Sequence, residues 1–154
     1  MLFRSPVQAA CSFGLDGGGW TLLTVYSDDG ANNWTWAKKA LWTSDTTVFG
    51  ALADISKDYK SALLHTLPFK DVLFMHAPST VWASYHDVGD GKQTFAAKMT
   101  GVPAPVCYQP TDGFVMTAGT LKAGAVAGAG ELCSTKLYLN MDDHDGNPTC
   151  GDDD

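Results

Sequence analysis

The side chains best placed for chemistry lie at the C-terminal end of the chain. Residues 142–154 hold six of its seventeen acidic residues. Carboxylates a few ångströms apart repel one another unless a cation lies among them. Ca²⁺ binds carboxylate, amide and backbone oxygens, and turn residues let several of these converge. We therefore predict a calcium site here, for which Asp142, Asp145 and Asn147 have suitable chemistry.

Other readings of this acidic segment are open. Blocks of like charge are usually solvated tails, but Gly146, Pro148 and Cys150 interrupt this one, which favours a folded loop. An EF-hand starting at Asp143 would place Pro148 where the loop requires glycine, and it would lack the bidentate Glu. Zinc bound through cysteine and His144 fits less well, because the surrounding oxygens favour a hard ion.

Composition narrows the classes of partner. The net charge is −7, and it falls to −1 once the six terminal aspartates are set aside. No basic stripe is present to neutralise phosphates, so we expect no nucleic-acid partner. No apolar stretch reaches the ~18 residues that a membrane span needs, so we expect no membrane insertion. With 154 residues, 45% of them hydrophobic, the chain can form one domain over residues 1–154.

Four cysteines without a CxxC pair favour disulfides over zinc or thiol redox chemistry. Disulfides indicate a secreted, extracellular protein. Residues 1–6 do not look like a secretory signal, so we expect the signal to lie upstream and the chain to be a piece of a longer protein.

The elements that position these groups are mainly strands joined by loops, since Asp and Gly are abundant and form turns better than helices. Aromatic and β-branched runs predict strands, one short helix is expected near Trp36–Trp42, and the small residues of 123–130 predict a flexible loop. The predicted strands are 20–26, 71–77, 80–86, 113–118 and 136–140.

A glycine-rich segment carries the most specific motif. Cys11 is followed by Asp16-Gly17-Gly18-Gly19-Trp20-Thr21, in which three glycines permit backbone angles closed to other residues. No Gly-Lys-Ser/Thr or GxGxxG spacing supports a phosphate loop. The segment resembles the opening of fibrinogen-related domains.

Two further blocks are similar to the intelectin branch of that superfamily. Asp58-Tyr59-Lys60-Ser61 is followed by residues 67–78, which include Lys70-Asp71-Val72 and end in a His-x-Pro pattern. The third block runs from Leu132-Cys133 through His144 to Cys150-Gly151. The resemblance implies an α+β fold of the fibrinogen C-terminal kind, with a twisted, mainly antiparallel sheet, long calcium-binding loops and few short helices.

The resemblance also implies calcium-dependent carbohydrate binding, in which vicinal hydroxyls of a sugar complete the coordination of a protein-held Ca²⁺. His144 matches the ligand histidine and Asp143 the acidic residue before it, so both are expected to bind metal and glycan. Asp28, Asp29 and Asp58 lie where the family has acidic ligands and suggest a second calcium, although a turn and a helix cap would explain them equally well. Family likeness favours a Cys133–Cys150 disulfide and leaves a Cys11–Cys107 bond open.

We therefore expect a lectin-like module that binds glycans or cell-surface polysaccharide and is free to oligomerise. The alternative is a fibrinogen-like protein-interaction module in which calcium is purely structural; a third is a carbohydrate-binding appendage of a larger enzyme. No Gly-x-Ser-x-Gly or His-Glu-x-x-His motif is present, so the chain itself is not expected to be an enzyme. His65, His76 and His86 are expected to be structural, while Trp34, Trp36 and Tyr108 are candidates to stack on a sugar.

Overall fold

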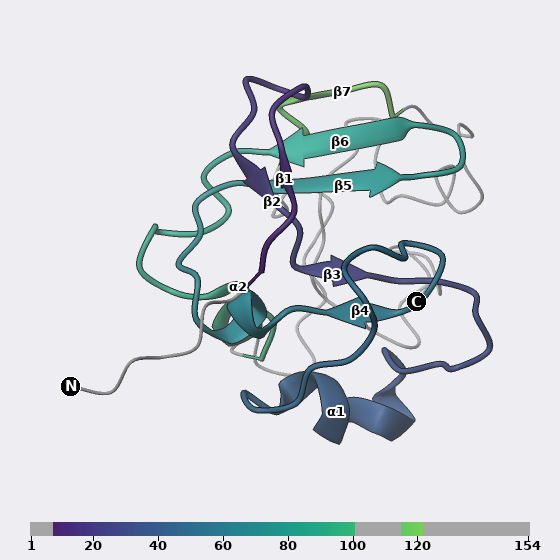
Figure 1. Cartoon of the computed structure of the whole chain (residues 1–154). Coiled ribbons are helices and arrows are strands. Elements are labelled where there is room, and N and C mark those ends of the chain that lie inside the picture. The colour runs from purple at the N-terminus through teal and green to yellow at the C-terminus, as the bar shows by residue number, and fades with distance from the viewer. Residues whose placement is uncertain (1–7, 101–114, 122–154) are drawn as a thin grey trace, which may run out of the picture. The chain divides into compact units, whose positions relative to one another are not determined.

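The computed structural model of the chain describes residues 8–100 and 115–121, and Figure 1 shows their arrangement into short helices and small sheets. These residues are α+β in class, as predicted. They form three small antiparallel sheets in place of the single larger sheet that was expected. The described residues fall into two compact units. A single domain over residues 1–154 stays a prediction.

The first unit contains residues 8–67 together with 94–97. Strands β1 (Cys11–Ser12) and β2 (Trp20–Thr21) pair across the glycine-rich turn, and β3 (Thr24–Val25) pairs with β4 (Tyr59–Lys60). Both pairs are antiparallel. The helical segments are η1 (Trp36–Lys38), α1 (Lys39–Thr43) and η2 (Ala62–His65).

The predicted strand 20–26 is divided into β2 and β3, because the chain changes partner within it. Leu22 donates its backbone N–H to Ala10 at 2.9 Å, and Ser61 donates to the carbonyl of Leu23 at 2.9 Å. The segment therefore lines up with the N-terminal strand first and with the Asp58–Ser61 block afterwards. Its apolar composition predicts an extended conformation correctly, but it carries no signal of this exchange of partners.

The second unit contains residues 68–93, 98–100 and 115–121 of the described chain. Strands β5 (Val72–His76) and β6 (Val81–Tyr85) form the predicted hairpin, with Val72 opposite Tyr85 and His76 opposite Val81. Of the predicted strand 113–118, residues 113–114 lie outside the described part, residues 115–117 are not in a strand, and Ala118 belongs to the short β7 (Ala118–Gly119), which pairs with β6. The sheet order is β5-β6-β7. Helix α2 (Phe95–Thr100) begins in the residues assigned to the first unit.

Each unit has a small buried core. Tyr59 and Leu64 are buried in the first unit, and their burial fixes the position of the Asp58–Ser61 block. Phe69, Tyr85 and Val88 are buried in the second unit. The predicted helix near Trp36–Trp42 is confirmed as η1 followed by α1, although α1 buries none of its residues.

Candidate functional site

The glycine-rich turn owes its sequence to backbone geometry. Gly17, Gly18 and Gly19 have φ angles of +79°, +81° and +83°, a region that favours glycine. A Cβ on Gly18 would lie 2.8 Å from the Cα and the carbonyl oxygen of Phe13, whereas one on Gly17 would meet nothing within 4 Å. The Trp20 indole N–H donates to the Leu15 carbonyl at 2.8 Å and closes the turn. The motif is therefore a local structural device.

Two predicted calcium ligands, Asp29 and Asp58, are brought together by the structure. The Asp58 backbone N–H donates to Asp29 Oδ2 at 3.0 Å. In turn, Asp58 Oδ1 accepts from the Ser27 N–H and Oδ2 from the Asn33 N–H, both at 2.9 Å. We call these two residues the carboxylate brace, because they tie the loop 27–33 to the segment before β4. Asp58 is 4% exposed and caps no helix, whereas Ser61 caps η2.

The surroundings of Asp29 favour its ionised form. Its Oδ1 also accepts the Ala31 N–H at 2.8 Å. The pKa of the Asp29 carboxyl is lowered by the hydrogen bonds from the backbone of Ala31 and of Asp58, with a smaller contribution from the charge of Lys57. Such a stable negative charge suits a cation ligand as well as a structural brace, since each carboxylate oxygen keeps a spare lone pair.

Asp28, the third predicted ligand of this group, is exposed and takes no part in the brace. Across residues 8–100 and 115–121, no three His, Cys, Asp or Glu side chains gather closely enough to hold a metal ion. The structure thus brings together the chain segments of Asp29 and Asp58 through backbone amides. The second calcium site stays a prediction.

The buried ammonium group of Lys60, two residues after Asp58, was missed by the sequence reasoning. The Lys60 Nζ donates to the carbonyl oxygens of Leu41 at 3.0 Å, of Thr47 at 2.9 Å and of Ser44. We call this the ammonium cage. Lys60 is 1% exposed, and burial lowers the pKa of its ammonium group, opposed by the nearby charge of Asp45. The sequence shows only a lysine in the Asp58–Ser61 block, which would fit an exposed position equally well.

An aromatic cluster lies in the first unit, and one of its members, Phe49, pairs with Lys60. The Trp34 ring centroid lies 4.6 Å from that of Tyr26 and 5.3 Å from that of Phe49. The Trp34 indole N–H donates to the Val25 carbonyl at 2.8 Å. Trp34 was predicted as a stacking residue, but Tyr26, which is 54% exposed, was missed because it ends a predicted strand.

Two of the histidines that were expected to be structural have a hydrogen-bonding partner for the imidazole ring. His65 Nε2 lies 3.1 Å from the Trp42 carbonyl oxygen, and His76 Nδ1 lies 2.7 Å from the Ser79 hydroxyl. Neither contact links the histidine to an acidic residue. Enzymatic inactivity stays a prediction.

Several predicted site residues lie outside the described residues. They include Tyr108 and both members of the predicted Cys133–Cys150 disulfide. Cys11 is an exposed free cysteine in the structure, and since Cys107 lies outside the described residues, a Cys11–Cys107 bond stays an open possibility. The main calcium site also lies outside the described part, with all of its predicted ligands: Asp142, Asp143, His144, Asp145 and Asn147.

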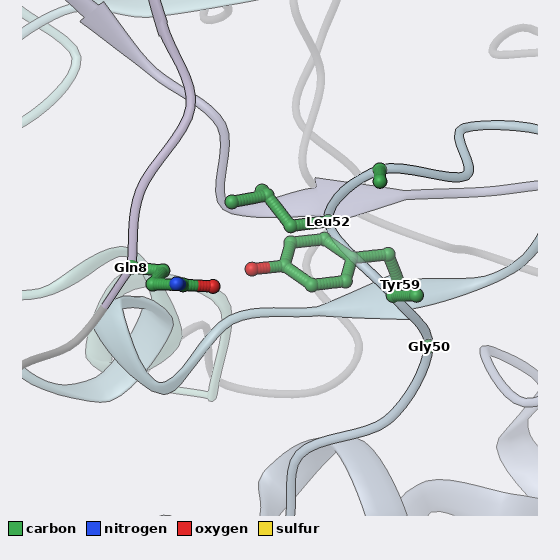
Figure 2. A pocket seen from close by; sticks show the side chains of 6 residues that line it. Gln8, Gly50, Leu52 and Tyr59 are labelled. Carbon is green, nitrogen blue, oxygen red and sulfur yellow. The ribbon is translucent and has the colours of Figure 1, made fainter.

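An open hollow of about 610 Å³ lies in the first unit, beside β4. It is lined by Gln8, by residues 50–53 and by Tyr59. Figure 2 shows the Tyr59 hydroxyl directed towards Gln8, with Leu52 next to the ring. A Cβ on Gly50 would overlap the Asp58 carbonyl oxygen, so this glycine lets the loop pass close to β4. The hollow offers one amide and one hydroxyl without a charged group, and we assign it no ligand.

Comparison with known proteins adds no relative. No protein-family model, no curated protein and no solved structure matches this chain.

In the part of the chain that the structure describes, no helix is both long and apolar enough to cross a membrane.

Proposed function

We propose that this chain is a calcium-dependent carbohydrate-binding module of the fibrinogen-related, intelectin-like kind, secreted and directed at exposed vicinal diols of glycans. The observation that carries the proposal is the carboxylate brace. Asp58 belongs to a block that resembles the family, and Asp29 lies where the family has acidic ligands; their segments lie together although the two residues are 29 positions apart. The convergence of these two predicted ligand positions supports the proposal.

The chemistry of the acidic segment supports the same role. Residues 142–154 offer carboxylate, amide and imidazole ligands, and a sugar diol adds two neutral oxygens that replace bound water on Ca²⁺. Under this proposal His144 and Asp143 contact both the ion and the glycan, while Asp142, Asp145 and Asn147 complete the site.

Calcium titration by calorimetry on the full chain tests the metal. We expect His144→Ala to weaken calcium binding about tenfold or more, since it removes a ligand. A saturating excess of calcium of about 100 times Kd should stabilise the fold by about 2.7 kcal/mol, a gain that chelator removes. His76→Ala is the matched control, because His76 contacts only an exposed serine hydroxyl among the described residues. An unchanged titration for His144→Ala would remove this residue from the site.

One observation favours the alternative of a protein-interaction module. Phe74 and Met75 on β5 are 40% and 53% exposed, and β5 is an edge strand within the described residues. Exposed apolar side chains on a strand edge suit a protein partner. Inhibition separates the two functions: free monosaccharides or glycerol should compete with glycan binding, whereas binding to a protein partner should be insensitive to both.

A further inference from the structure

The contact between Tyr26 and Trp34 leaves one aromatic ring open to solvent on a fixed support. Their ring planes are inclined by 40°, and Tyr26 is 54% exposed. Trp34 is held from two sides, by its hydrogen bond to the Val25 carbonyl and by an edge contact with Phe49 at an interplanar angle of 63°. Tyr26 therefore rests on a support that cannot easily turn away.

Tyr26 keeps more than half of its surface exposed while its ring contacts Trp34. The part of the ring that Trp34 does not cover is therefore open to solvent. Such a surface binds the C–H face of another ring.

Polar side chains lie in the same loop. Asp28 and Asn32 are exposed, and within the described residues no partner is recorded for either side chain. The carboxylate brace fixes this loop, because it binds the backbone N–H groups of Ser27, Ala31 and Asn33. Two hydrogen-bonding groups thus stand on a loop that needs no reordering before it binds a ligand.

The charges around the loop disfavour an anionic ligand. Asp29 and Asp54 each interact with the charge of Lys57, and the Lys38 ammonium group donates to the Ala31 carbonyl. Phosphate groups would be repelled by the carboxylates of Asp28 and Asp29. A neutral polyhydroxylated ring meets no such repulsion, and an organic cation is the alternative occupant that the tetramethylammonium measurement tests.

From this geometry we propose that Tyr26 and Trp34 form a stacking platform for a neutral saccharide ring, with Asp28 and Asn32 as hydroxyl-binding groups. The inference rests on the proposed function and deepens it, since it adds a saccharide subsite outside the acidic segment. The platform contributes ring stacking, whereas Ca²⁺ contributes diol coordination.

Saturation-transfer NMR and titration test the platform on the full chain, with the methyl glycosides of glucose, galactose, mannose and N-acetylglucosamine as probes. Each probe is measured in calcium and again in EDTA. We expect Tyr26→Ala to weaken glycoside binding about tenfold, the loss of one good stacking contact. Tyr26→Phe should stay within about twofold of the wild type, because it keeps the ring. Phe13→Ala, at an aromatic position that is 79% exposed, is the matched control.

The outcomes separate the two proposals. Calcium-dependent binding that Tyr26→Ala leaves unchanged overturns the platform and keeps the proposed function. Binding that Tyr26→Ala weakens but EDTA does not affect overturns the calcium dependence and keeps the platform. Absence of any glycoside binding by the wild type overturns both, and binding of tetramethylammonium in its place, lost in Tyr26→Ala, identifies a cation site. Thermal melting of each variant confirms that it is folded.

Discussion

Two loops of the first unit are closed by opposite kinds of charge. In the carboxylate brace, Asp29 and Asp58 collect backbone N–H groups, and in the ammonium cage Lys60 collects backbone carbonyls. Asp29 is half-buried and its ionised form is favoured, whereas Lys60 is buried and its ionised form is penalised. A carboxylate can thus hold backbone N–H groups, and an ammonium group can hold backbone carbonyls. Of Asp29 and Lys60, only the partly hydrated Asp29 does so at low electrostatic cost.

The largest expected effect comes from removing the buried cation. Lys60→Met should lower the free energy of unfolding by about 3 to 4 kcal/mol, because the carbonyls of Leu41, Ser44 and Thr47 lose a charged donor. Chemical denaturation measures the change. The exposed Lys57→Met is the control and should remain within about 0.5 kcal/mol of the wild type. Equal losses for the two variants would show that the ammonium cage is unimportant.

Removing the buried carboxylate should have the next largest effect. Asp58→Ala leaves the N–H groups of Ser27 and Asn33 without their acceptor and should lower the unfolding free energy by about 2 to 3 kcal/mol. Asp28→Ala, at an exposed position outside the brace, should change it by less than about 0.5 kcal/mol. If both variants melt at the same temperature, the brace does not hold the loop.

The glycine-rich turn sharpens the comparison, because it is closed without charge. Gly18→Ala should destabilise the fold by about 2 kcal/mol, since it adds both an unfavourable φ and a close contact with Phe13. Gly17→Ala has the unfavourable φ alone and should cost about 1 kcal/mol. The difference between the two melting curves isolates the contact, and a larger loss for Gly17→Ala would contradict the observed turn.

The smallest effect is a dependence on acid. The folded-state pKa of Asp29 lies below the ordinary value of 3.8, so the unfolded chain binds this proton more readily. The stability that Asp29 provides is therefore complete above about pH 4 and is lost as the pH falls through the lowered folded-state pKa. Unfolding of the wild type and of Asp29→Asn should converge in acid. A constant difference down to pH 2 would refute this linkage.

Local composition was sufficient to predict the hairpin of β5 and β6, the helix near Trp36–Trp42 and the glycine-specific backbone angles at Gly17–Gly19. Each of these depends on neighbouring residues, on alternation, propensity or glycine content, which a sequence displays directly. Asp29 and Asp58 were also singled out from the sequence, as acidic residues at positions where a similar family has metal ligands. Their partners were not, because a carboxylate that binds an ion and one that binds backbone amides look alike in a sequence.

What the sequence alone determined is therefore the inventory: an acidic chain rich in turns, with short strands and a few polar residues that needed a role. Only the tertiary structure decided which segments meet. It divided the predicted strand 20–26 between two partner strands and hydrogen-bonded the Lys60 ammonium group to three carbonyls. It also left Tyr26 exposed to solvent while its ring contacts Trp34. These contacts join residues as far apart as Thr24 and Lys60, and their free energies depend on burial and direction, which no local pattern specifies.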